Sequence, residues 1–186
     1  MEKSPLGALE KELGGAGKAT PGQPFLCGDV DIRIARDGTW FYHGSPIGRK
    51  RLVKLFASVL RREASGDFWL VTPAEKCRIQ VDDAPFTAVE MSVEGTGRNQ
   101  RLTFRTNVDE NVIAGPGHPL RVAMDPATGE PSPYIYVRDG LEALIVRAVF
   151  YDLADLGVDE PQPDGTTSFG VWSGGEFFPL GDTGEP

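Results

Sequence analysis

The chain has 186 residues, of which 40% are hydrophobic and 25% charged, and its formal net charge is −8 at pH 7. This composition excludes overall disorder and is typical of a globular protein with one substantial core or two small ones. The acidic balance disfavours general nucleic-acid binding, because contact with phosphates needs a positive surface. Residues 49–62 are the local exception, since they hold six cations and no acid.

The two cysteines, Cys27 and Cys77, are far apart and lack CxxC spacing. They indicate neither a disulfide framework nor a structural zinc site, and free thiols favour a reducing compartment. The N-terminus lacks the apolar stretch of a signal peptide, and no stretch approaches the roughly 18 apolar residues of a membrane span. We therefore expect a cytoplasmic protein with no membrane partner and no cofactor.

Residues 1–24 are rich in Gly, Pro, Lys and Glu, and we expect them to form a mobile tail. Residues 31–34 and 39–42 flank Arg36-Asp37-Gly38. Because Asp-Gly supplies positive φ angles, this pattern predicts two strands joined by a tight turn.

The stretch from Arg49 to Glu63 predicts an amphipathic helix, because its apolar residues recur at the spacing of one helix face. Ser45 and Pro46 predict its start, and Ser65-Gly66 predicts its stop. The apolar face consists of Leu52, Leu55, Phe56, Val59 and Leu60. A charge at Leu55 is then expected to cost on the order of 3 kcal/mol or more.

The opposite face of this helix carries Lys50, Lys54 and Arg61. Cations in the first turn of a helix oppose its dipole, and like charges one turn apart repel each other. An anionic partner relieves both conflicts, so this face predicts contact with an acidic protein surface, a phosphate-bearing ligand or the chain's own acids.

Two hairpins follow the helix. Residues 67–71 and 76–81 flank a turn at 72–75, and residues 86–94 and 100–106 flank Gly95-Thr96-Gly97. Alternation of apolar and polar residues predicts one buried face in each hairpin.

The second half repeats the order of the first. Residues 121–124 and 134–137 predict a strand pair, 141–156 a helix, and 168–180 a closing hairpin. The spacing of the apolar face of the first helix recurs 89 residues later. The hairpin at residues 67–81 recurs at an offset of 101, which aligns Glu176 with Glu75. Recurrence of both features favours an internal structural repeat.

These elements predict an α+β fold of two similar antiparallel half-barrel-like β units, each with one main helix and related by an internal repeat. We expect the first unit at residues 25–84, a linking β-hairpin and loop at 85–118, and the second unit at 119–186.

Four segments resemble a bacterial family catalogued as domain of unknown function 1285. They are GTWFYHGSPIGRKRLVKLF, DFWLVTPAEKCRIQVDDAPF, YIYVRDGLEALIVRAVFYDL and FGVWSGGEFFPLG, and the resemblance covers residues 25–181. It implies a two-domain α+β fold with similar half-barrel-like motifs and a role in ligand binding or signalling. It carries over no catalytic residues.

The chain contains no GxSxG, Walker A, HExxH or Rossmann GxGxxG signature. We therefore favour a non-enzymatic regulatory module that binds a small molecule or an acidic protein surface in the cleft between the two units. Its candidate ligand-binding residues are Trp40, His43, Glu75, Lys76, Asp82, Arg138 and Arg147.

The alternative is a metal- or water-dependent hydrolase that uses Glu75, Asp82 or His43. Structural roles compete with both readings, because Trp40 falls in a predicted strand and Glu75 in a hairpin turn. Arg147 lies in a mostly apolar predicted helix and needs a partner. We expect it and Arg138 to pair with acids of the first half such as Glu75 or Asp82.

Overall fold

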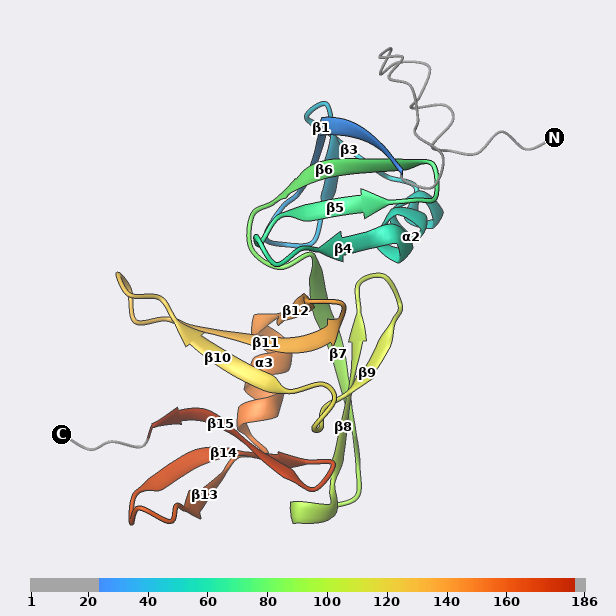
Figure 1. Ribbon diagram of the computed structural model, residues 1–186. Coiled ribbons are helices and arrows are strands. Elements are labelled where there is room, and N and C mark those ends of the chain that lie inside the picture. The colour runs from blue at the N-terminus through green and yellow to red at the C-terminus, as the bar shows by residue number, and fades with distance from the viewer. Residues whose placement is uncertain (1–23, 183–186) are drawn as a thin grey trace. The chain divides into compact units, whose positions relative to one another are not determined.

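The structure, a computed structural model, describes residues 24–182 (Figure 1). The expected N-terminal tail therefore lies outside the described residues except for Pro24. Two compact units divide the chain, with residues 24–35 and 39–82 in the first and residues 36–38 and 83–182 in the second. Neither described helix is long and apolar enough to cross a membrane.

The first unit is a six-stranded mixed sheet with one helix, and its strand order is β3-β2-β1-β6-β5-β4. Strands β1 and β6 run parallel, and the remaining neighbours are antiparallel. The elements are β1 (Phe25–Ile34), β2 (Trp40–Tyr42), β3 (Ser45–Pro46), α2 (Lys50–Val59), β4 (Leu60–Arg62), β5 (Phe68–Val71) and β6 (Glu75–Val81).

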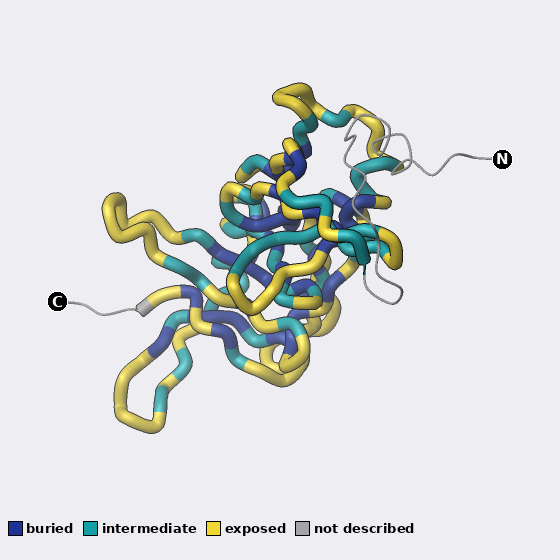
Figure 2. Tube along the Cα trace, turned by 45° about the horizontal axis from the view of Figure 1, so that its top comes forward, coloured by how far each residue is buried: buried dark blue, intermediate teal, exposed yellow. Residues whose placement is uncertain are grey.

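The core of the first unit forms where inward-facing strand residues meet α2. Val30, Ile32 and Ile34 alternate with exposed residues along β1, as expected for a strand with one covered face. Trp40 stacks on Phe56 of α2 with ring centroids 6.1 Å apart. Figure 2 shows the same contrast along the chain, with buried residues in the strands and exposed residues at many of the turns.

Helix α2 begins later and ends earlier than expected. Ser45 and Pro46 form β3 rather than a helix start, because His43 and Gly44, with φ angles of 47° and 75°, make a two-residue turn that pairs Ser45 with Tyr42. The helix ends at Val59, and Leu60 starts β4. Leu55 is 38% exposed, so its expected place in the core is wrong.

The second unit contains two sheets and one helix. Its six-stranded sheet has the order β10-β11-β12-β7-β8-β9, with β12 and β7 parallel, and a three-stranded sheet has the order β13-β14-β15. The larger sheet comprises β7 (Phe86–Glu94), β8 (Arg101–Thr106), β9 (Asn111–Ile113), β10 (Leu120–Met124), β11 (Pro131–Arg138) and β12 (Leu141–Ile145). The rest comprises a 3₁₀ turn (Gly97–Asn99), α3 (Arg147–Ala154), β13 (Val158–Pro161), β14 (Thr167–Ser173) and β15 (Glu176–Asp182). Residues 85–118, which we expected to link the units, thus supply β7, β8 and β9.

The helix expected at 141–156 is half strand. Asp139 and Gly140 have φ angles of 50° and 75°, and Arg138 pairs with Leu141 across this two-residue turn. Residues 141–145 then alternate between buried and half-buried as β12, and only α3 is helical. The Asp-Gly pair is a strong hairpin signal, and it outweighs the helical spacing of the following leucines.

The internal repeat is present, and its fold of two similar half-barrel-like units is confirmed. Three strands, a helix and three strands form β1–β3, α2 and β4–β6, and the same order recurs in β10–β12, α3 and β13–β15. The hairpin offset of 101 is right, since β6 begins at Glu75 and β15 at Glu176. The helix offset of 89 is wrong, because the positive-φ turn at residues 43–44 recurs at 139–140, which is 96 residues later. The two six-stranded sheets are mixed rather than purely antiparallel, because each contains one parallel pair.

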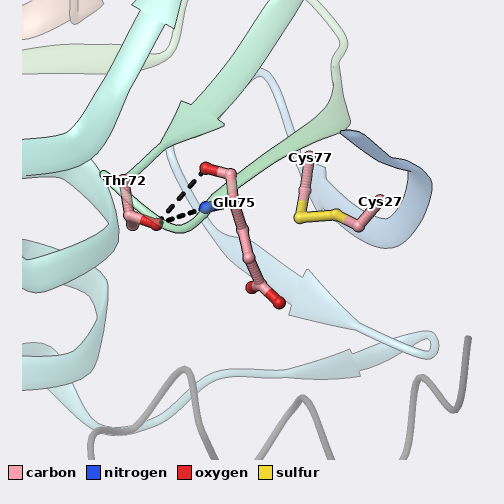
Figure 3. The surroundings of a disulfide bond; sticks show 4 residues. All are labelled: Cys27, Thr72, Glu75 and Cys77. Atoms are coloured by element: carbon pink, nitrogen blue, oxygen red, sulfur yellow. Dashed lines mark hydrogen bonds between the residues drawn. A yellow bond between two sulfur atoms is a disulfide. The ribbon is translucent and has the colours of Figure 1, made fainter. Parts of the chain in front are cut away.

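Cys27 and Cys77 form a disulfide, with their Cα atoms 5.2 Å apart (Figure 3). The expectation of free thiols is therefore wrong. Parallel pairing places Gly28 opposite Cys77, and a register shift between Leu26 and Gly28 brings Cys27 alongside. The two cysteines are 50 residues apart in the sequence, so their proximity could not be inferred from local spacing.

We predict that Phe56→Ala lowers the free energy of unfolding by about 3–5 kcal/mol, because it removes a fully buried ring that stacks on Trp40. The neighbouring change Leu55→Ala should cost less than about 1 kcal/mol, since that side chain is partly exposed. Urea denaturation of both variants and the parent measures the difference. Equal losses in the two variants would contradict the helix register.

We also predict that Cys27→Ser lowers the free energy of unfolding by about 2–4 kcal/mol, because the disulfide restricts the unfolded chain. A reductant should destabilise the parent by a similar amount and leave Cys27→Ser unaffected. Denaturation midpoints with and without reductant test this, and a parent insensitive to reductant would argue against the cross-link.

Candidate functional site

Glu75 and Lys76 lie at the start of β6. The backbone N–H of Glu75 donates to Thr72 Oγ1 at 3.0 Å, and Thr72 Oγ1 lies 3.3 Å from the Glu75 carbonyl oxygen (Figure 3). Lys76 Nζ pairs with Glu63 and lies 4.5 Å from the centroid of the Trp69 ring. These contacts fix the turn between β5 and β6.

Trp40 and His43 have contrasting environments. Trp40 is 1% exposed, so its side chain belongs to the core of the first unit. His43 is exposed, and its Nδ1 lies 3.1 Å from Asp31 Oδ2. Its positive φ and its place in the turn between β2 and β3 give it a structural role.

Asp82 makes a bidentate ion pair with Arg33, at 2.9 Å from Nε and 2.6 Å from Nη2. The hydrogen bond from Arg33 lowers the pKa of this carboxyl group below its usual value; burial opposes this effect, and the positive charge of Arg33 adds to it. Within residues 24–182, no group of three or more His, Cys, Asp and Glu side chains is placed to hold a metal ion.

The acids beside Arg138 and Arg147 belong to the second unit, rather than to the first unit as we expected. Arg138 Nε lies 3.2 Å from Glu110 Oε1, and its Nη1 lies 3.6 Å from Asp139. Arg147 Nη2 lies 3.8 Å from Glu130 Oε1, and both of these side chains are largely exposed. Each of the two arginines thus has an acidic neighbour within its own unit.

Arg147 lines a hollow of about 300 Å³ in the second unit, which we call the second-unit hollow. The start of α3 meets β11 and the end of β12 there. Arg147 is the first residue of α3, a helix with no side-chain cap and no acid in its first turn. A cation at this position opposes the helix dipole by about 0.3–1 kcal/mol. The hollow is lined by Arg36, Glu130, Pro131, Ser132, Pro133, Leu144, Ile145, Val146, Arg147, Phe150 and Tyr151.

Arg36 brings a second guanidinium group to the second-unit hollow. Its Nη2 donates to Ser132 Oγ at 2.8 Å, and its Nε lies 3.3 Å from Asp83 Oδ2. The other oxygen of Asp83 accepts a hydrogen bond from Tyr134 at 2.8 Å. Burial, then the Asp83 carboxylate, raise the pKa of Tyr134 above its usual value.

Residues 36–38 group with the second unit although they precede most of the first. The Asn107 side-chain amide donates to the Gly38 carbonyl at 3.2 Å, and a Cβ on Gly38 would lie 2.6 Å from that amide nitrogen. Gly38 also has a φ of 85°, so both space and backbone favour glycine. This packing holds the segment that carries Arg36.

A larger hollow of about 400 Å³ lies in the first unit, lined in part by Asp29, Asp67 and Arg78. Arg78 makes a bidentate pair with Asp29 and lies 3.8 Å from Asp67. The hydrogen bond to Arg78 lowers the pKa of Asp29. Because these charges already pair with one another, this hollow offers a ligand less than the second-unit hollow does.

The basic face of α2 has a partly structural role. Arg61 follows the helix, and its Nη1 donates to the carbonyl oxygens of Ser58 and Leu60 at 3.2 and 2.7 Å. It therefore caps the end of α2. Arg49, Lys50 and Arg51 are exposed where the helix begins, and no acid lies in its first turn.

The sequence identified Arg147 but missed Arg36, Ser132 and Asp83. These residues come from three separate segments, and local spacing contains no signal that they meet. The one available hint was the neighbouring acid pair Asp82-Asp83, of which only Asp82 was named as a candidate. In the structure Asp82 pairs with Arg33, and Asp83 pairs with Arg36.

The fold and hollows together define a two-unit α+β protein with a repeated strand–helix–strand order and a small hollow beside α3 that combines an apolar wall with two arginines. "Domain of unknown function (DUF1285), N-terminal domain" matches residues 21–84, and "Protein of unknown function (DUF1285), C-terminal domain" matches residues 85–180. The chain belongs to the DUF1285 family.

Two solved structures are similar to it. A DUF1285 family protein from Silicibacter pomeroyi DSS-3 is 52% identical with a TM-score of 0.82, and the match covers 98% of this chain and 97% of the other. A DUF1285 family protein from Shewanella baltica OS155 is 25% identical with a TM-score of 0.53, covering 68% of this chain and 91% of the other. No curated protein matches the chain.

We predict that Asp82→Asn destabilises the first unit near neutral pH and has a smaller effect in acid. The pKa of Asp82 is lower in the folded state than its unfolded value of 3.8. Its ion pair therefore stabilises the fold at pH values above 3.8, and this stabilisation is lost as the pH falls through the pKa of the folded state. Exposed pairs contribute at most about 1 kcal/mol. Melting temperatures of the parent and variant should differ at pH 6 and converge below pH 3.8.

A matched control is Asp159→Asn, which changes an exposed acid of β13 in the second unit. A difference between the parent and Asp82→Asn that persists unchanged into acid would show that the ion pair with Arg33 is not its cause.

Proposed function

We propose that the protein is a non-enzymatic regulatory module that binds a small organic molecule in the second-unit hollow. The observation that carries this proposal is the meeting of two arginines, Arg36 and Arg147, with an apolar wall around about 300 Å³. Small-molecule sites are concave, mostly apolar, and carry a few polar groups that orient the ligand. The volume is at the lower end of the roughly 300–1,000 Å³ found for such sites, which favours a small ligand.

Binding is a better proposal than catalysis for this hollow because of the groups that line it. Guanidinium groups stay charged at all physiological pH values, so they orient anions but are poor proton donors or acceptors. Glu130 is the one lining carboxylate, and it is 69% exposed. The residues of the hydrolase alternative, Glu75, Asp82 and His43, lie in the first unit. Asp82 pairs with Arg33 and His43 with Asp31, and the backbone of Glu75 is bonded to Thr72 in a turn.

A thermal-shift panel of small carboxylates, amines and neutral alcohols tests the proposal. A compound that binds the folded state raises the melting temperature in a concentration-dependent way. We predict that Arg147→Ala removes most of this increase for the compounds that stabilise the parent. The control Arg98→Ala should preserve it, because Arg98 is comparably exposed and pairs with Glu160 away from the hollow.

Two results would contradict the proposal. One is a parent that no member of the panel stabilises. The other is equal stabilisation of the parent and Arg147→Ala, which would place the binding site elsewhere.

A further inference from the structure

We infer, on the basis of the binding function proposed above, that the ligand of the second-unit hollow is an amphipathic organic anion. We infer further that Asp83 tunes its affinity by competing for Arg36. The anionic group is a carboxylate or phosphate held by Arg36 and Arg147, and the apolar part lies along the start of α3.

The charge of the hollow selects the sign of the ligand. Two guanidinium groups face one carboxylate, that of Glu130, so the lining has a positive balance. The chain as a whole has a net charge of −8, so a hollow with a positive lining differs from the balance of the whole chain. Guanidinium groups pair well with carboxylate and phosphate because their parallel N–H groups fit two oxygens at once.

The wall of the hollow selects an apolar tail. Val146 directly precedes α3, Phe150 and Tyr151 lie in its first turns, and Tyr151 is 59% exposed. Leu144 and the buried Ile145 of β12 continue this surface, with Pro131 and Pro133 on β11. A purely inorganic anion would leave this apolar surface in water, whereas an aliphatic or aromatic tail would cover it.

Asp83 is poorly matched to Arg36, and this leaves the guanidinium available to a ligand. Its Oδ2 lies 3.3 Å from Arg36 Nε, yet within the described part of the chain this buried oxygen accepts no hydrogen bond. Asp83 is held from its other side by Tyr134, and Arg36 is held by Ser132. An anion in the hollow would meet a guanidinium already oriented by Ser132 and would compete there with the misaligned carboxylate of Asp83.

The test is an NMR titration of the ¹⁵N-labelled full chain with octanoate, octyl phosphate and the neutral analogue octanamide. The arginine Nε–H signals of Arg36 and Arg147 and the backbone amides of Ser132 and Val146 report on the hollow. Octanoate or octyl phosphate should bind at least about tenfold more tightly than octanamide, because charge-assisted hydrogen bonds add to the shared tail contacts. Comparison of the two anions distinguishes a carboxylate from a phosphate ligand.

The Asp83→Asn variant tests the competition. Asparagine keeps an acceptor for Tyr134 and removes the negative charge beside Arg36, so octanoate should bind about fivefold more tightly. Arg36→Ala should weaken octanoate binding about tenfold, and Arg98→Ala should leave it unchanged. The salt dependence of octanoate binding to the parent needs no variant, and affinity should fall as the salt concentration rises.

The outcomes separate this inference from the binding function itself. Octanamide that shifts the same amides as tightly as the two anions, or octanoate binding that ignores both salt and Asp83→Asn, would overturn the anion assignment while the hollow remains a binding site. If none of the three compounds shifts the signals of the hollow, the anion inference fails. If the thermal-shift panel also finds no ligand, the proposed function fails with it.

Discussion

The parallel pairing of β1 with β6 is the contact on which the first unit depends. Two antiparallel groups of three strands, β1–β3 and β4–β6, are each local in sequence, and only this pairing joins them into one sheet. A parallel pair cannot be closed by a tight turn, so the intervening chain has to supply a crossover, and α2 lies within it. The disulfide between Cys27 and Cys77 crosses the same pair of strands and covalently fixes its closure.

The second unit has the same element order but joins its parts differently. Strand β12 pairs in parallel with β7, so the extra strands β7–β9 extend the sheet, and β13–β15 form a separate sheet that contacts it through β10 and β15. Buried polar contacts add to this junction. Ser173 Oγ donates to the Ala114 carbonyl and accepts from the Leu102 N–H, and the Gln100 side chain donates to the Trp172 carbonyl. These contacts take the place of a continuous ladder and satisfy groups that burial would otherwise leave unpaired.

Local turn chemistry decided how much of the fold was predictable from the sequence. The hairpins around Gly38 and Gly95 were predicted correctly, because glycine and alternating residues sit together there. The His43-Gly44 and Asp139-Gly140 turns were overlooked, and each mistake assigned strand residues to the start of a helix. No element was predicted at residues 158–161, yet they form β13 against β14. A strand with few apolar residues has little periodic signal. The disulfide was missed for a different reason, since pairing between distant strands leaves no local pattern.

The candidate site shows the same division between local and distant information. Arg147 was singled out because a charge in an apolar stretch needs a partner, but in the structure it is largely exposed at the start of a shorter helix than expected. Arg36 was interpreted only as part of a turn, and its approach to Ser132 and Asp83 depends on how residues 36–38 pack against the rest of the second unit. The hollow therefore contains two cations with different origins. Arg147 could be noticed in the sequence, whereas Arg36, 111 residues earlier in the chain, reaches the same hollow only through the fold. The positive charge of each arginine is only partly compensated. Arg147 lies at a helix start, which disfavours a cation, and its nearest acid oxygen is 3.8 Å away. The carboxylate oxygen beside Arg36 makes no hydrogen bond within the described residues. A single anion between the two arginines would compensate both charges. The second-unit hollow is therefore a better candidate site than the larger hollow of the first unit, whose charged side chains pair with one another.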